Sequence, residues 1–219
     1  MRKAQGFLLL LTIIGLTACA TPAKPPEMLG AQPAGIGISV GIDSALQNQT
    51  PNATYFVRLS DRNNVLSSYP AVIRSNYVNG YSVYLLNAEP GIYAAVAASY
   101  SQFLAPPAPV VSGFNVTVSS GTIGRVAYFP ENLIRKTVVE VKPGTISYMG
   151  TYEVDMAAMA GFRSADKAQE HYRSQMQSGL ISTFQSAEKK AVRDLASEKE
   201  FFQKAREDFS DSDWLRIIR

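Results

Sequence analysis

Apolar and polar residues alternate in short runs between residues 36 and 156. Ile36, Ile38 and Val40 are separated by single small residues, and residues 54–60 are rich in aromatic and β-branched side chains. Successive side chains point to opposite faces of a β-strand, so a period of two is typical of half-buried strands. The pattern therefore predicts a β-rich unit over residues 36–156.

Residue pairs with strong turn preferences separate these runs. An Asn-Gly pair between two apolar runs favours a tight hairpin, and Asn79-Gly80 is the clearest case. Pro90-Gly91 and Pro143-Gly144 each precede a further apolar run. About seven to nine strands at this spacing, with no helical segment of normal length between them, predict a β-sandwich rather than a parallel α/β sheet.

Beyond residue 163 the apolar residues follow a helical spacing. Ser164 can cap a helix that extends to about residue 177, and Ser197 and Glu200 have the spacing of a capping box. Apolar residues that would share one helical face recur at steps of three and four: Leu180, Phe184, Ala187, Ala191 and Leu195. The predicted fold class is mainly β, with two or three α-helices over residues 164–219.

The apolar stripe of this helical segment has two interpretations. A surface helix normally packs such a stripe on the core, here on one face of the sandwich. Alternatively the stripe, together with Trp214, docks a partner protein as a helix in a groove. Both interpretations remain open from the sequence.

The first 18 residues form a separate unit with the order of a secretory signal peptide. Arg2 and Lys3 supply positive charge, residues 7–16 are almost continuously apolar, and small residues follow. The apolar run is too short for a transmembrane helix, which needs about 20 residues. We therefore expect residues 1–18 to be removed.

The end of this leader, Leu16-Thr17-Ala18-Cys19, resembles the lipobox of bacterial lipoproteins. The resemblance implies cleavage between Ala18 and Cys19, a diacylglyceryl group on the thiol, and a fatty acyl chain such as palmitate on the new amino group. Ala20, where an Asp would retain the protein in the inner membrane, implies the outer membrane, facing the periplasm. Residues 19–35 are rich in proline and are expected to form a lipidated, flexible tether.

Composition narrows the functional classes. The chain has 21 basic and 18 acidic residues; two basic residues lie in the leader, which leaves 19 against 18, a net charge of +1. A nearly neutral chain gives no argument for nucleic-acid binding. Acylation would consume the single cysteine, so the fold would contain no disulfide.

Three segments resemble a family of bacterial lipoproteins of unknown function. They are Tyr55-Phe56-Val57-Arg58, Pro90-Gly91-Ile92-Tyr93 and the stretch 142–150, which contains Tyr148 and Gly150. The family has a small sandwich domain similar to the prealbumin-like regulatory domains of carboxypeptidases, and several members end in a Glu-Lys-rich helix followed by a Trp, as residues 198–217 do. The resemblance implies a prealbumin- or Ig-like sandwich, with a bulge or close packing at Gly150, and it supplies no catalytic residues.

The candidate binding surface consists of aromatic residues. Tyrosines crowd the first half of the predicted sandwich, and Tyr81 and Tyr84, with Trp214, form a possible binding surface. Tyrosine also suits half-buried strands, which is the alternative explanation. The only histidine, His171, is expected to be a solvated helix residue, and we expect no catalytic residue, metal or cofactor.

These observations predict a non-enzymatic, lipid-anchored envelope protein that serves as a binding or scaffolding module. One alternative is an envelope accessory that binds carbohydrate or peptide, or an enzyme, on the tyrosine-rich face. Another is a small subunit of an outer-membrane machine, which would contact an envelope protein through the C-terminal helices.

Overall fold

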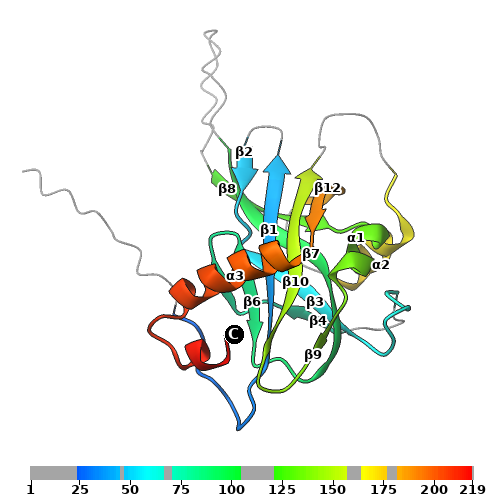
Figure 1. Ribbon diagram of the computed structural model, residues 1–219. Coiled ribbons are helices and arrows are strands. Elements are labelled where there is room, and N and C mark those ends of the chain that lie inside the picture. Colours follow the sequence, from blue (N-terminus) through cyan, green and yellow to red (C-terminus); the bar gives the residue numbers. More distant parts are fainter. Residues whose placement is uncertain are drawn as a thin grey trace, which may run out of the picture.

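Two sheets packed face to face form the body of the protein (Figure 1). The computed structural model describes residues 24–44, 47–66, 71–104, 121–156, 164–176 and 182–218. The first sheet has the order β12 (Ala187–Val192), β10 (Ile146–Met156), β1 (Gly35–Ser44), β6 (Ser82–Leu86) and β5 (Tyr77–Asn79), with β2 (Gln47–Gln49) beside β1. The second has the order β11 (Ser182–Gln185), β8 (Gly121–Tyr128), β7 (Gly91–Leu104), β3 (Ala53–Leu59) and β4 (Val72–Arg74), with β9 (Val139–Val141) beside β7.

The sandwich predicted from alternation is confirmed. Ile36, Ile38, Val40 and Ile42 all face the space between the sheets and are fully buried. Burying an aliphatic side chain of this size contributes about 1.5–3 kcal/mol. Twelve strands occur among the described residues, more than the seven to nine expected, because several are only three residues long and two lie in the segment expected to be helical.

The predicted hairpin between residues 77 and 86 is present with a shifted turn. Asn79 pairs with Ser82, so the two central turn residues are Gly80 and Tyr81 rather than Asn79 and Gly80. Gly80 has φ +60°, in the left-handed region that glycine adopts without steric cost. The shift places Tyr81 at the tip of the hairpin.

The glycine expected to allow a bulge, Gly150, lies in one. Gly37 of β1 pairs in parallel with Tyr148 of β10, and Ser39 pairs with Thr151, so β10 carries one additional residue between these pairs. Gly150 has φ +131°, which disfavours any residue with a side chain. The bulge shifts the pairing of β10 with β1 by one residue, at the place where the C-terminal helix crosses the sheet.

The helix predicted over residues 180–195 is wrong, because residues 182–192 form strands. Strand β11 pairs in parallel with β8, and β12 pairs antiparallel with β10. Each strand covers a sheet edge that would otherwise expose unpaired backbone groups. Pairing with these edges therefore overrides the helical spacing of the apolar residues.

Three α-helices and one 3₁₀ helix complete the described fold. Helix α1 (Glu131–Thr137) lies within the β-rich part and was not expected; α2 (Lys167–Gln175) begins after Asp166, two residues beyond Ser164. Helix α3 (Leu195–Asp208) begins after Asp194, whose carboxylate caps the Ser197 amide, so the predicted capping box starts three residues too late. The last helix is η1 (Asp213–Ile217), and the Ser212 side chain caps it by accepting a hydrogen bond from the Trp214 amide.

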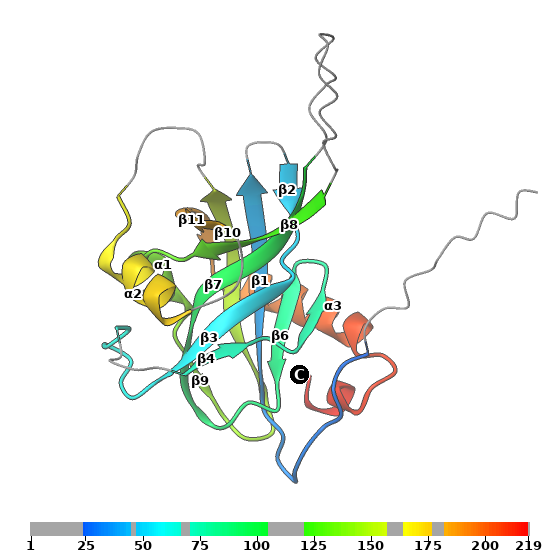
Figure 2. The ribbon, with the colours of Figure 1, turned by 180° about the vertical axis from the view of Figure 1, so that it is seen from behind.

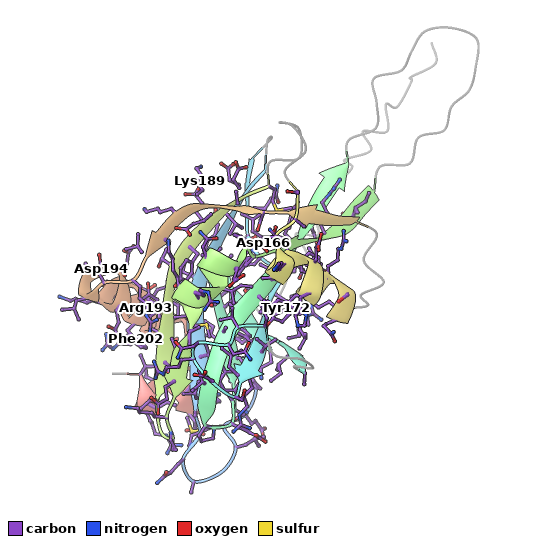
Figure 3. The ribbon with its side chains drawn as sticks, turned by 90° about the vertical axis from the view of Figure 1, so that its right-hand side faces the viewer. Asp166, Tyr172, Lys189, Arg193, Asp194 and Phe202 are labelled. Atoms are coloured by element: carbon purple, nitrogen blue, oxygen red, sulfur yellow. The ribbon has the colours of Figure 1, made fainter. Side chains whose placement is uncertain are left out.

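The helices occupy two separate places on the sandwich. Helices α1 and α2 lie together at one side of the two sheets, whereas α3 crosses the outer face of the first sheet (Figures 1 and 2). Figure 3 shows Arg193 and Asp194 at the start of α3, away from Asp166 and Tyr172 at α2. Helix α3 packs on the sandwich through Phe201 and Ala205 and not through the predicted stripe of residues 180–195, whose last member, Leu195, is exposed.

Candidate functional site

A second apolar cluster lies outside the sandwich core, between the first sheet and the chain's C-terminal elements. Its buried members come from β5, β6 and β10 on one side and from α3, η1 and their flanking residues on the other: Tyr77, Tyr84, Leu86, Ile146, Tyr148, Phe201, Ala205, Phe209, Trp214 and Ile218. We call α3, η1 and residues 24–34 the terminal clasp. The clasp holds both ends of the described chain against one sheet.

Aromatic contacts make up much of this cluster. The ring of Tyr84 lies with its centroid 5.5 Å from that of Phe201 and 4.9 Å from that of Phe209. The ring of Phe201 also lies 4.9 Å from Tyr148 and projects over Gly37, where a Cβ atom would come within 2.4 Å of the ring. Glycine at position 37 therefore lets α3 approach the sheet closely.

A buried carboxylate at the end of α3 ties the helix to the β5–β6 hairpin. The Asp208 side chain is fully buried; its Oδ2 accepts a hydrogen bond from the Tyr84 hydroxyl at 2.8 Å, and its Oδ1 accepts one from Asn79 Nδ2 at 2.8 Å. Lys204 Nζ also donates to Oδ1. Burial, followed by the charge of Asp208, raises the pKa of Tyr84 well above its ordinary value, so the hydroxyl remains a donor.

The N-terminal segment is bound to the same clasp. Trp214 Nε1 donates to the Pro26 carbonyl at 2.7 Å. Asn87 donates to the Glu27 carbonyl at 2.8 Å and accepts from the Leu29 amide at 2.9 Å. The flexible tether predicted over residues 19–35 is therefore wrong for residues 26–34; residues 19–23 lie outside the described part.

The clasp encloses a groove of about 660 Å³ between its N-terminal segment and the turn after α3. The groove is lined by Tyr77, by residues 24–28 and by residues 208 and 210–213. Its charged residues are Lys24 and four acidic residues, Glu27, Asp208, Asp211 and Asp213. Acidic side chains therefore outnumber basic ones in this groove.

Two smaller hollows, each of about 330 Å³, flank Tyr81 on the outer face of the first sheet. Both are bordered by Ser39, Tyr81 and Thr151; Lys190 lines one of them and Lys204 the other. Tyr81 is 46% exposed, and we call this residue, together with both hollows, the Tyr81 face. This surface combines an exposed ring with hydroxyl and ammonium groups.

The predicted binding surface of Tyr81, Tyr84 and Trp214 is wrong in two of its three residues. Tyr84 and Trp214 are fully buried and serve as the anchors of the clasp, because each has a polar atom that reaches a partner within it. Tyr81 alone is exposed. The predicted processing residues, Ala18 and Cys19, lie outside the described residues.

The remaining candidate residues give no chemical constellation in the described part of the chain. His171 is half-buried in α2, with its ring edge-on to Tyr172 at 4.9 Å. Among residues 24–218, within the ranges described, no three His, Cys, Asp or Glu side chains are placed to hold a metal ion. None of the helices described there is both long and apolar enough to cross a membrane.

Asp208, Asn79 and Asn87 hold the clasp together but were not predicted as site residues. One signal was available for Asp208: an acidic residue at the C-terminus of a helix is unfavourable for the helix dipole, so another interaction has to compensate. Its spacing from Lys204 instead resembles an ordinary surface pair. No local pattern marks Asn79 as a partner of Asp208 or Asn87 as a partner of Glu27, because these partners are distant in sequence.

Comparison of the chain with protein families, with curated proteins and with solved structures finds no match in any of the three. The fold itself defines the class, a mainly β protein with a two-sheet sandwich and C-terminal helices. Within this class, the terminal clasp and the Tyr81 face are the features from which a function can be argued.

Proposed function

We propose that this protein is a lipid-anchored lipoprotein of the bacterial cell envelope that acts as a binding or scaffolding module. Cys19 would carry the lipid, in the outer membrane facing the periplasm, and the sandwich would present a surface to another envelope component. The supporting observation is the lipobox-like Leu16-Thr17-Ala18-Cys19 directly after a basic and apolar leader.

The anchor requires several acyl chains. One chain gives only reversible binding to a bilayer, since each buried methylene contributes about 0.8 kcal/mol. Modification of both the thiol and the amino group of Cys19 would supply stable attachment. The thiol is essential because the alkylation step needs its nucleophilic sulfur.

Membrane fractionation tests the anchor. The full chain, expressed in a bacterium with lipoprotein processing, is expected in the membrane fraction, and Cys19→Ser is expected to release it or leave it unprocessed. A Ser44→Cys, Cys19→Ser double variant controls for the mere presence of a thiol. Equal membrane association of wild type and Cys19→Ser would reject the proposal.

The Tyr81 face is the surface that we propose for binding, and carbohydrate or peptide is the ligand class that it favours. An exposed tyrosine offers a flat apolar ring with a polar edge, which suits stacking on a sugar or packing on a peptide. Neighbouring hydroxyl and ammonium groups can donate hydrogen bonds to such a ligand.

Binding of the intact lipoprotein to arrayed cell-wall glycans and peptides tests this second proposal. Tyr81→Ala is expected to weaken binding by about tenfold or more, as loss of an aromatic hot-spot residue does. Tyr81→Phe retains the ring and should bind more tightly than Tyr81→Ala. Leu195→Ala, which also truncates an exposed apolar side chain, is the control and should bind as the wild type does. An unchanged affinity of Tyr81→Ala would reject this surface.

A further inference from the structure

We infer that the terminal clasp docks the sandwich on the bilayer that holds the lipid, with the exposed side chains of Leu29 and Leu215 against the lipid headgroups. The inference rests on the proposed anchor at Cys19 and adds an orientation to it. Its partner is the lipid surface itself.

Only a short stretch of chain joins the proposed anchor to the clasp. Pro26, fixed by the hydrogen bond from the Trp214 indole, follows Cys19 by seven residues. An extended chain covers at most ~3.6 Å per residue, so Pro26 stays within about 25 Å of the lipidated sulfur. A free tether up to Gly35 would reach about 58 Å by the same measure, more than twice as far.

The folded domain is wider than this connection is long. A folded domain of about 195 residues has a radius of gyration of about 16 Å and is therefore about 40 Å across. Helices α2 and η1 lie on opposite sides of the molecule (Figures 1 and 2). The short connection keeps the η1 side near the membrane, whereas the α2 side is free to lie one molecular diameter away.

The clasp carries two exposed apolar side chains. Leu29 is 64% exposed and Leu215 is 39% exposed. Their chain neighbours are in contact, since an Arg216 guanidinium nitrogen lies 3.8 Å from the Met28 sulfur, so the two leucines belong to the same end of the molecule. A single exposed leucine is ordinary, but two on the clasp can gain about 25 cal/mol per Å² buried in the interface.

Charge does not drive this docking. Arg216 and Lys24 are basic, but Glu27 and Asp213 lie among them, and Arg216 pairs with Asp213 at 3.4 Å. Acidic side chains outnumber basic ones here, so anionic headgroups give this docking no electrostatic assistance. The area of apolar contact and the length of the connection decide the orientation.

Site-directed spin labelling of the lipidated protein in vesicles tests this orientation. An introduced cysteine is the only free thiol once Cys19 is acylated. Labels are placed through Leu215→Cys and, as the control, Arg173→Cys, an exposed position in α2 on the opposite side of the molecule. The vesicles contain phosphatidylethanolamine, phosphatidylglycerol and a nickel-chelating lipid, whose headgroup metal accelerates the relaxation of nearby labels.

The expected result is several-fold greater relaxation at Leu215→Cys than at Arg173→Cys. Equal relaxation at both positions, with the protein on the vesicles, would overturn the orientation while the anchor stands. If the label at Leu215→Cys were immobilised in native membranes but not in vesicles, a protein partner rather than the lipid surface would cover this side chain. That result would also overturn the orientation. Failure of the processed protein to join the vesicles would instead reject the proposed anchor, and the orientation with it.

Discussion

Asp208 is the residue on which the clasp converges. Its buried carboxylate accepts hydrogen bonds from Tyr84, Asn79 and Lys204, which belong to the sheet, the hairpin and the helix itself. A buried acceptor with good partners contributes modestly to folding stability. A buried donor that loses its acceptor, however, destabilises the fold by its full desolvation free energy. The residue therefore determines whether α3 stays on the sheet.

Asp208→Asn tests this role. The amide nitrogen would face donors where the carboxylate accepted hydrogen bonds, and we expect a loss of about 1–3 kcal/mol in the free energy of unfolding. Urea titration followed by the fluorescence of Trp214, the only tryptophan, measures it. The control is Glu207→Gln, since the neighbouring Glu207 side chain is 66% exposed and its loss should change stability by less than about 0.5 kcal/mol. Equal effects of the two substitutions would contradict the role of Asp208.

At the scale of elements, α3 and β1 fit together because β1 carries small residues on its outer face. Gly37 lies directly under Phe201, whereas Gly41, on the same face of the same strand, lies in a more open place. A Cβ at position 37 would come within 2.4 Å of the Phe201 ring, but at position 41 the nearest atom would be 3.7 Å away. The two glycines thus form a matched pair.

Gly37→Ala is expected to destabilise the clasp by about 1–3 kcal/mol, as overpacking does in a filled core. Gly41→Ala should be neutral or slightly stabilising, because alanine restricts the unfolded chain. Near-ultraviolet circular dichroism and urea unfolding measure both substitutions. If Gly37→Ala were as stable as Gly41→Ala, the close contact between α3 and β1 would be refuted.

Element types could be predicted where local signals and tertiary contacts agree. The alternation at Ile36, Ile38 and Val40 identified a core strand, and the turn glycine Gly80 identified the β5–β6 hairpin. The helix predicted over β11 and β12 was wrong, because pairing with the free edges of the two sheets determines the conformation of these residues. No local sequence pattern shows where those edges are. The candidate site was predicted least well: Tyr84 and Trp214 were recognised as important aromatic residues, but burial could not be read from their sequence neighbours.

At the scale of the whole molecule, buried tyrosine hydroxyls connect the parts of the fold. Tyr172 of α2 donates to the Val65 carbonyl, and Tyr152 of β10 donates to the Lys136 carbonyl of α1 at 2.9 Å. Burial raises the pKa of Tyr172 to about 12 and also raises the pKa of Tyr152. These hydroxyls stay protonated in the folded state after unfolded tyrosines, with a pKa of about 10, have ionised.

Stability should therefore be constant with respect to tyrosine ionisation below about pH 10 and should fall above it. Between about pH 10 and pH 12 the unfolded chain releases a proton that folded Tyr172 retains, so the free energy of unfolding decreases by about 1.4 kcal/mol per pH unit for each such group. Tyr172→Phe should reduce this slope, after a loss of about 1 kcal/mol at neutral pH from the missing hydrogen bond. Urea unfolding between pH 7 and pH 11 measures the slope. An identical slope in wild type and Tyr172→Phe would contradict the buried hydroxyl.

Attachment to a bilayer is the claim that connects the leader, the short connection to Pro26 and the clasp. Mass spectrometry of the amino-terminal peptide, from protein purified out of bacterial membranes, tests it most directly. The account predicts a mature chain that begins at Cys19 and carries the added mass of a diacylglyceryl group and an amide-linked fatty acid. A chain that begins elsewhere, or a Cys19 without lipid, would contradict it.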